Sequence, residues 1–223
     1  MNTLTKLALG LMGQLRPQPA AGDAAATTAL LPPRQDGGLP LMQALLLRQS
    51  RREFSIEPLS DQCLSDLLWA AAGVNRPELG GRTGPSAMNA QEVQVHVALP
   101  QGLFLYEPQP HALRLVARSD VRRVTGYQDF VDLAALDLVY VADHTRMKLV
   151  PAAQREAYSF AAAGAMAQNV YLYCASAELS TVVRAWFDRE ALSQAMGLGT
   201  DQQVLLAQTV GSAILQPGEA PVP

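Results

Sequence analysis

Three short segments of the chain carry side chains whose types and spacing could bind a ligand. The first covers residues 48–55, with the sequence RQSRREFS, and follows an apolar run. Alternate side chains of an extended segment share one face, so Arg48, Ser50 and Arg52 are expected to converge, with Gln49 between them. Two guanidiniums and a hydroxyl make a receptor for a phosphate dianion, because arginine offers a planar fork of donors. The alternative is a solvated basic turn.

The second segment covers residues 82–91, with the sequence RTGPSAMNAQ, and leads into the first strand pattern. Its small and amide side chains, among them Ser86, Asn89 and Gln91, provide hydrogen-bonding groups without bulk. Such groups suit edge-on contact with a flat, polar heterocycle. The alternative is a capped turn in which Ser86 is the N-cap.

The third segment covers residues 178–186, with the sequence ELSTVVRAW, and follows a long apolar helix pattern. A helix that leads into a short strand exposes backbone groups near the end of the strand, where ligands can dock. The alternative is an ordinary helix-to-strand connection with Arg184 paired on the surface.

Other catalytic or metal chemistry finds no support in the residue pattern. The cysteines Cys63 and Cys174 lie far apart in apolar helical contexts, and no cysteine or histidine pair has the spacing of metal ligands. Both cysteines are interpreted as buried small hydrophobic residues. No Ser–His–Asp, Cys–His or paired-carboxylate arrangement is found, so we assign no catalytic side chain and no metal ligand.

The elements that must position these segments alternate between helical and strand patterns. A helix is expected at residues 61–72, where Ser60 provides the N-cap and Gly73 ends the helix. The continuous apolar run at residues 136–142 indicates a central strand. The order of elements indicates an α+β fold rather than a regular βαβ winding. The pattern predicts further helices at 41–47 and 158–179 and further strands at 93–97, 103–106, 112–117 and 203–210.

The composition indicates one main domain that hides much of its surface. The helix predicted at residues 158–179 is apolar almost all round, which predicts burial on every side. Of the 223 residues, 49% are apolar and 17% are charged, below the roughly 25% charged residues typical of soluble domains. Either the chain buries an unusual share of its surface, or a partner covers part of it. The net charge of −3 gives no support for nucleic-acid binding, and no apolar run is long enough for a membrane span.

The two ends of the chain differ from its body. Residues 1–15 resemble a weak secretory signal, with Lys6 before a short apolar run. The alternative is an amphipathic helix followed by a Pro/Ala-rich arm at 16–33 that lies across another surface. We expect an N-terminal helix and arm at 1–38, a main domain at 39–215 and a tail at 216–223. The cytoplasm is the favoured compartment, and the signal-like segment leaves the periplasm as the alternative.

The order of the three segments is more specific than any one of them. The pattern Arg48-x-Ser50-x-Arg52 is followed by PSAMNAQ at 85–91, then by GAMAQNVYL at 164–172 and STVV at 180–183. This order resembles the nitroreductase-like flavoprotein family. The resemblance is greatest to its SagB-type branch, which also contains the peptide azoline dehydrogenases, and it covers about residues 39–211.

The resemblance implies an α+β fold with a central, mostly antiparallel sheet flanked by helices. It also implies an intertwined homodimer with two FMN molecules at the subunit interface. Arg48, Ser50 and Arg52 would hold the FMN phosphate, with Gln49 among the cofactor-binding residues, and the backbone around Thr181–Val183 would face the flavin ring. The residues that the other subunit would place along the isoalloxazine and ribityl chain are Pro85, Ser86, Ala87 and Asn89, with Gln91 at its edge.

The sequence departs from the family pattern in two ways. Family members often carry a basic residue near the C-terminus that also binds the phosphate, but this chain has no Lys or Arg after Gly211. Either Arg184 takes this place, which makes it a cofactor-binding residue too, or the phosphate has fewer partners. The Lys and Tyr pair of the azoline dehydrogenases is not placed in this sequence.

The function that the resemblance implies is that of an FMN-dependent oxidoreductase. Hydride would pass from NAD(P)H through the flavin to a small electrophile, such as a nitroaromatic or a quinone, by a ping-pong mechanism. The alternatives are a SagB-type dehydrogenase acting on a peptide or small molecule, and an FMN-binding protein without turnover. The expected partners are a second copy of the chain, NAD(P)H and a small electron acceptor.

Overall fold

A computed structural model of the chain describes residues 2–12, 16–19 and 25–214. The tail predicted at residues 216–223 therefore lies outside the described residues. Within the described ranges, no helix is both long enough and apolar enough to cross a membrane.

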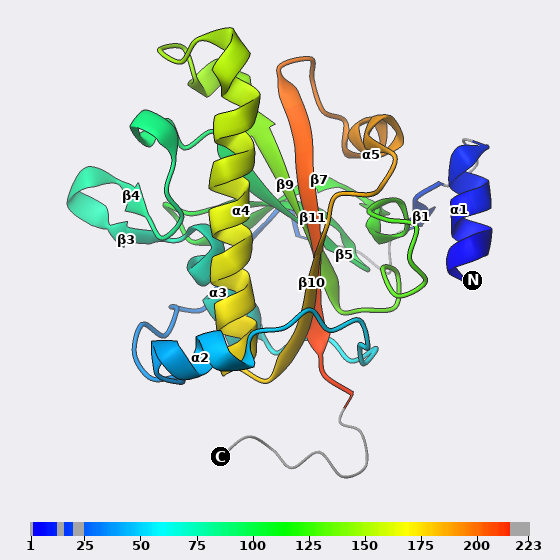
Figure 1. Cartoon of the computed structure of the whole chain (residues 1–223), viewed down its shortest axis with the longest axis horizontal. Helices are drawn as coiled ribbons and strands as arrows, with labels where there is room; N and C mark the ends of the chain where they lie inside the picture. The colour runs from blue at the N-terminus through cyan, green and yellow to red at the C-terminus, as the bar shows by residue number, and fades with distance from the viewer. Residues whose placement is uncertain (1, 13–15, 20–24, 215–223) are drawn as a thin grey trace.

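One seven-stranded sheet forms the centre of the fold, and every neighbouring pair of its strands is antiparallel. The strand order is β10–β11–β9–β5–β6–β7–β2, as Figure 1 shows. β9 lies between β11 and β5, which confirms the prediction of a central strand. The strands are β2 Thr27–Ala29, β5 Val93–Leu99, β6 Gly102–Glu107, β7 Ala112–Ala117, β9 Leu136–Asp143, β10 Leu179–Arg184 and β11 Gln202–Ser212.

Helices cover both faces of this sheet (Figure 1). α3 (Asp61–Ala72) and α4 (Ala152–Ser176) pack on one face, against a cluster that includes Tyr140 of β9. α5 (Arg189–Met196) packs on the other face, against a cluster that includes Val139 and Val141. Alternate residues of β9 thus face different clusters, as the pleat of a strand requires. The α+β fold class is confirmed.

Shorter elements complete the chain. α2 (Leu41–Leu47) confirms the helix predicted there, and α3 has the predicted bounds, with Ser60 as its N-cap and Gly73 as its C-cap. Cys174 is buried as predicted, whereas Cys63 is half-buried, and both thiols are free. The remaining elements are α1 Thr3–Leu11, β1 Gln18–Pro19 paired with β8 Ser119–Asp120, β3 Val74–Arg76 paired with β4 Gly81–Arg82, and 3₁₀ turns at Pro77–Leu79, Ala87–Asn89, Arg122–Val124 and His144–Arg146.

The long helix α4 differs from its prediction in bounds and in burial. It begins at Ala152 rather than at Tyr158, since its first residues are helical although they lack the apolar periodicity on which the prediction rested. It ends at Ser176, before Glu178, whose φ of 55° lies outside the right-handed helical region. Burial on every side was wrong for the single chain, because one face of α4 is exposed. Tyr158 on this face is 41% exposed, and Ala161 and Gly164 are exposed as well. The face was mistaken for a buried one because its residues are small and mostly apolar.

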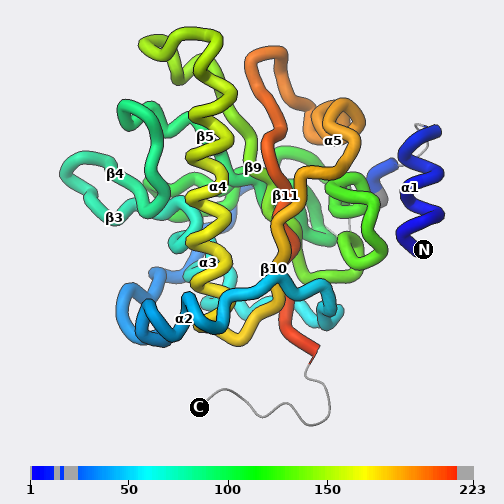
Figure 2. The backbone as a smooth tube through the Cα atoms, in the orientation of Figure 1, coloured from blue at the N-terminus to red at the C-terminus, as the bar shows by residue number. Residues whose placement is uncertain are grey.

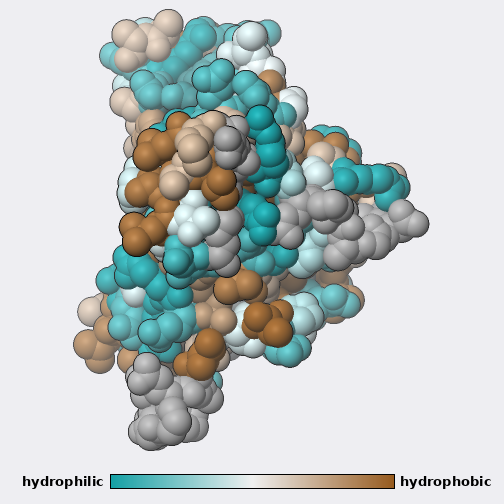
Figure 3. Space-filling view, turned by 90° about the vertical axis from the view of Figure 1, so that its right-hand side faces the viewer, coloured by the Kyte–Doolittle hydropathy of each residue, from teal (hydrophilic) through white to brown (hydrophobic). Residues whose placement is uncertain are grey.

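The described N-terminal residues include one helix, α1, and two short strands, and the choice between a signal segment and an arm stays a prediction. Strand β1 pairs with β8, and strand β2 extends the main sheet beside β7. Figure 3 shows hydrophobic residues gathered on the side of the molecule where α1 lies, and Leu4, Leu11 and Met12 of this helix are exposed. The attachment of α1 therefore does not bury its largest apolar side chains.

A buried ion pair attaches α1 to the body instead. The Lys6 side chain is fully buried, and its Nζ lies 2.5 Å from Asp132 Oδ1 and donates to the carbonyl oxygen of Gln128 at 3.0 Å. Asp132 also pairs with Arg123 at 3.1 Å. Burial alone would raise the pKa of Asp132, but the hydrogen bonds and charges of Lys6 and Arg123 hold it below its usual value.

Lys6→Met should release α1 while keeping a side chain of similar length. Because a buried carboxylate loses one of its partners and keeps Arg123, we expect the free energy of unfolding to fall by about 1–3 kcal/mol, less than the cost of breaking an isolated buried pair. Because the pKa of Asp132 is depressed, its ion pairs stabilise the native state at pH values above the usual Asp pKa. This stabilisation is lost as the pH falls through the lowered pKa, so the variant should lose part of the dependence of stability on acid pH. Chemical denaturation at several pH values measures both effects.

The control is Lys148→Met, which removes the same charge from an exposed position. It should leave the unfolding free energy within about 0.5 kcal/mol of the parent value. Equal stabilities of the two variants would contradict the role given to Lys6.

Candidate functional site

Strand β10 lies at an edge of the main sheet, and the first predicted segment covers that edge. The Arg51 backbone N–H donates to the Thr181 carbonyl oxygen of β10 at 3.0 Å. Further along, Ser55 N–H donates to the Ser212 carbonyl oxygen at 2.9 Å, and Phe54 forms an isolated bridge with Ala213. Figure 2 shows the chain after α2 crossing β10 in this way. The structure thus brings the first and third predicted segments together.

Tyr171 of α4 joins these two segments through its side chain. Its hydroxyl accepts a hydrogen bond from the Val183 N–H at 2.9 Å and lies 2.8 Å from the Ser50 hydroxyl. The Arg48 guanidinium lies over the Tyr171 ring, 5.3 Å from its centroid. Tyr171 is 6% exposed, and a buried tyrosine hydroxyl usually finds such partners. Sequence reasoning did not name this residue as part of the site, although a tyrosine inside an apolar helix was the available signal.

The side chains of the first segment remain accessible beside Tyr171. Arg48 is half-buried, whereas Gln49, Ser50 and Arg52 are exposed. The Gln49 amide lies beside the Arg51 guanidinium. Arg48 and Ser50 meet at one tyrosine, so these two members of the expected phosphate receptor are brought together, and Arg52 follows on the exposed side of the segment.

The side chains of the third segment point to both faces of the sheet. Thr181 Oγ1 donates to the Thr209 carbonyl oxygen at 2.8 Å and accepts from Gln208 Nε2 at 3.1 Å. Val182 lies on the opposite face, in a small cluster with Phe54. The backbone of Thr181 and Val183 therefore forms the part of this segment that meets Arg51 and Tyr171.

Arg184 is not the surface-paired residue of the alternative interpretation. It is 7% exposed, and its guanidinium lies 2.5 Å from Asp137 and donates to the Thr125 carbonyl oxygen at 2.6 Å. Burial lowers the pKa of Arg184, and the charge of Asp137 acts in the opposite direction. The Arg184 guanidinium is therefore paired inside the fold, and whether it also serves the cofactor stays a prediction.

The second predicted segment forms a strained, internally bonded loop. Met88, Asn89 and Gln91 have φ angles of 54°, 53° and 53°, in the left-handed region that non-glycine residues rarely adopt. The Ser86 hydroxyl accepts from the Gln91 N–H at 2.9 Å, and Gln91 Nε2 donates to the Gly80 carbonyl oxygen at 2.7 Å. Ser86 stands at the N-cap position of a 3₁₀ turn, but its side chain makes no capping hydrogen bond to that turn and accepts from Gln91 instead. Such strain persists only where the surrounding structure over-determines it, and it gathers at functional sites.

Within the described residues, no hydrogen bond joins residues 85–91 of this loop to the other two segments, although Thr83, near its start, accepts from Asn169 Nδ2 of α4 at 3.3 Å. Pro85, Ser86 and Ala87 line a shallow pocket of about 180 Å³ together with Tyr158, Ala161 and Ala162 of α4. Ala161 and Tyr171 are ten residues apart on α4, which corresponds to about 15 Å along a helix. The expectation that the loop serves the site of another subunit therefore remains a prediction, and the geometry of the single chain leaves room for it.

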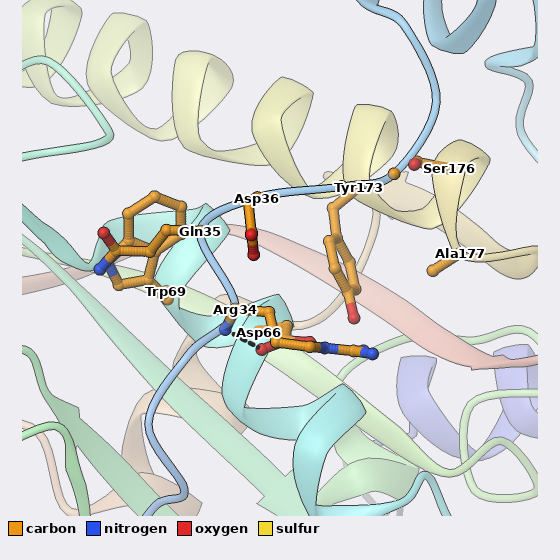
Figure 4. Close-up of a pocket in the computed structure, with 10 residues that line it drawn as sticks. Arg34, Gln35, Asp36, Asp66, Trp69, Tyr173, Ser176 and Ala177 are labelled. Atoms are coloured by element: carbon orange, nitrogen blue, oxygen red, sulfur yellow. Dashed lines mark hydrogen bonds and ion pairs between the residues drawn. The ribbon is translucent and has the colours of Figure 1, made fainter.

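A separate cavity of about 490 Å³ lies between residues 34–38, α3 and the end of α4. Figure 4 shows Trp69 and Tyr173 beside it, with Arg34 hydrogen-bonded to Asp66. Arg34 Nε donates to Asp66 Oδ2 at 2.8 Å, and Leu39 N–H donates to the Ser176 hydroxyl at 2.8 Å. These bonds attach the N-terminal arm to the helices. No residue of the three predicted binding segments lines this cavity.

Tyr171→Phe should weaken the junction without creating a cavity. The ring stays in place, but the Val183 N–H loses its acceptor and Ser50 loses its partner, so we expect the free energy of unfolding to fall by about 1–3 kcal/mol. Hydrogen exchange at Val183 should become faster because the amide is freed. Denaturant titration and amide exchange measure the two effects.

Tyr127→Phe is the matched control, because within the described residues the Tyr127 hydroxyl makes no hydrogen bond, while its ring packs edge-on against Trp186 and stays in place. This variant should be as stable as the parent within about 0.5 kcal/mol. A Tyr171→Phe protein that is equally stable and exchanges Val183 slowly would refute the junction.

Comparison with known proteins places this geometry in a family. The sequence model of the Nitroreductase family matches residues 45–212. A candidate nitroreductase of Methanocaldococcus jannaschii is 31% identical over 163 residues, which cover 68% of this chain and 82% of that protein.

Two solved structures extend the comparison. A candidate nitroreductase of Ralstonia eutropha is 51% identical, with a TM-score of 0.87, over 91% of this chain and 96% of that one. The NADPH:FMN oxidoreductase of Vibrio harveyi, solved with NAD⁺, is 21% identical with a TM-score of 0.58, over 82% of this chain and 72% of that one, and it shares the fold. The family inferred from the order of the three segments is therefore confirmed, and the chain belongs to the nitroreductase family.

Proposed function

We propose that the chain is an FMN-dependent oxidoreductase that uses NAD(P)H to reduce a small electrophile such as a nitroaromatic or a quinone. FMN would supply the redox chemistry, taking hydride from the nicotinamide and passing it to an acceptor that follows on the same open face. The chain would supply binding and orientation. This division of labour requires no catalytic side chain, and we assign none.

The junction at Tyr171 carries this proposal. It holds Arg48 and Ser50 beside the backbone of β10, so a phosphate bound by these side chains would leave the rest of the ligand next to Thr181 and Val183. A guanidinium and a hydroxyl side by side, with Arg52 exposed nearby, are donors suited to a phosphate monoester. The family, and the NADPH:FMN oxidoreductase that shares the fold, support flavin as the ligand.

The proposal includes a homodimer in which the 85–91 loop of one chain completes the site of the other. Gly164 supports this arrangement, because it lies in the exposed middle of α4 and a Cβ there would meet no atom within 4 Å. A glycine at an exposed helical position costs about 0.5–1 kcal/mol relative to alanine, so open solvent gives no reason for it. Close approach of a second helix does give a reason.

The purified protein should be yellow and should release flavin on denaturation. Arg48→Gln combined with Arg52→Gln should raise the Kd for FMN by about tenfold or more, because charge-assisted hydrogen bonds contribute about 1.5–3 kcal/mol each. Arg189→Gln is the control, since this exposed arginine lies on α5 beside Phe187. A colourless protein that takes up no added FMN would refute the cofactor assignment.

Steady-state oxidation of NADH and NADPH with nitroaromatic and quinone acceptors tests the reaction itself. We expect turnover that depends on both the donor and the acceptor. A protein whose bound flavin is reduced by neither nucleotide would contradict the oxidoreductase and favour an FMN-binding protein without turnover.

Gly164→Leu should disrupt the dimer, because the added side chain would stand between the two subunits. We expect a dimer of the parent chain at micromolar concentration and a shift toward monomer for the variant, measured by sedimentation velocity. Gln194→Leu places the same side chain on the exposed face of α5 and should leave the dimer intact. A parent chain that sediments as a monomer would refute the shared site.

A further inference from the structure

A second pocket, lined by arginines, lies away from the Tyr171 junction. It has a volume of about 330 Å³ and lies between the β3–β4 hairpin, the turn from β6 to β7 and the end of β9. Three arginines from distant parts of the chain, Arg82, Arg114 and Arg146, line it together. The hairpin that supplies Arg82 extends from the body of the fold in Figure 1.

Two of these three arginines are paired with carboxylates, and one of the two, Glu107, also lines the pocket. Arg114 Nε lies 2.7 Å from Glu107 Oε1, and Arg146 Nε lies 3.3 Å from Asp143 Oδ2. Both pairs are partly exposed, and exposed pairs contribute little and hold their partners loosely. Each guanidinium carries five N–H donors, so a pair made through Nε leaves other donors for a ligand.

Arg82 is the unbalanced member of the group. Among the described residues, no carboxylate lies within ion-pair distance of its guanidinium. Burial lowers the pKa of Arg82, and the nearby charge of Arg146 lowers it further. The charge of Glu92 acts on the pKa of Arg82 in the opposite direction. Glu92 is fully buried, its two carboxyl oxygens have no hydrogen-bond partner among the described residues, and burial raises its pKa. Two guanidiniums that repel each other beside a cavity are stabilised by an anion between them.

We propose that this pocket binds the phosphate group of a small molecule. A phosphate offers oxygens to several guanidiniums at once, and arginine forks match its geometry. The volume lies at the lower end of the range of small-molecule sites, about 300–1,000 Å³, and leaves room for more than a bare oxyanion. Gln94 and Gln109 add amide groups to the lining, while Pro108 and Pro110 stiffen the turn that borders it.

This site is separate from the one proposed for FMN and does not depend on it. Arg146 nevertheless connects the two regions, because its Nη1 donates to the Gln91 carbonyl oxygen at 3.4 Å. A ligand in the arginine pocket would therefore contact a residue bonded to the strained loop. The phosphate could belong to a free metabolite or to the 2′-phosphate of NADPH, and the two sources share the same chemistry.

Isothermal titration of the full chain with inorganic phosphate, pyrophosphate, NADPH and NADH tests the proposal. We expect pyrophosphate to bind, and Arg82→Gln to raise its Kd by about tenfold or more. Arg189→Gln removes the same charge from an exposed position on α5, outside the pocket, and it should change the Kd by less than about twofold. NADPH binding that depends on Arg82, with NADH unaffected, would identify the nucleotide as the source.

The proposal is overturned if phosphate, pyrophosphate and NADPH all fail to bind, or if Arg189→Gln and Arg82→Gln weaken binding equally. Circular dichroism and flavin content establish that each variant is folded. Should Arg82→Gln fail to fold, Arg146→Gln replaces it, because the Arg146 side chain is 42% exposed. An unchanged Kd in that folded variant also overturns the proposal.

Discussion

The free edge of β10 is the constraint on which the arrangement of the predicted binding segments depends. An edge strand leaves outward N–H and C=O groups without a sheet partner, and leaving a buried group unbonded costs about 1–3 kcal/mol. Two such groups are satisfied from different parts of the chain, by the Arg51 N–H and the Tyr171 hydroxyl. Ser50 and Tyr171, 121 residues apart in the sequence, are consequently brought together at this edge, where their hydroxyls form a hydrogen bond. Arg48 is then positioned over the same ring.

Within a single chain these two groups of the β10 edge are hydrogen-bonded, but the strain of one loop and the exposure of one helix face are not explained. The loop at residues 85–91 holds three non-glycine residues in left-handed conformations, and each costs of the order of 1–3 kcal/mol. The loop borders the exposed, small-residue face of α4 rather than the Tyr171 junction. A strained loop beside a helix face that carries Gly164 is explained if a second chain packs there. The low charged fraction of 17% points the same way, because the residues of this face are apolar and small.

Local signals were enough to predict much of the fold, and they failed where partners are distant. Ser60 and Gly73 mark the two ends of α3 as predicted, because a capping residue acts within one turn of the helix. The apolar run of β9 was enough to predict that this strand lies inside the sheet. The start of α4 was missed because residues 152–157 carry no apolar periodicity. The burial of Arg184 was missed because its partner, Asp137, lies 47 residues away on another strand. An aspartate inside the apolar run at 136–142 was the only local sign of that pair.

The buried pairs also explain why a few arginines are informative in this chain. With only 17% charged residues, several of the charges are used inside the fold, as in the pairs Lys6–Asp132, Arg122–Asp120 and Arg184–Asp137. Burying a charge is costly unless it is paired, so these pairs stabilise the fold. Within the described part of the chain, Arg48, Arg52 and Arg82 form no ion pair. The lack of an ion pair does not by itself identify a site, because Arg76 and Arg189 form none there either. Arg48 and Arg82 are informative because of where they lie, Arg48 at the Tyr171 junction and Arg82 in the lining of a cavity.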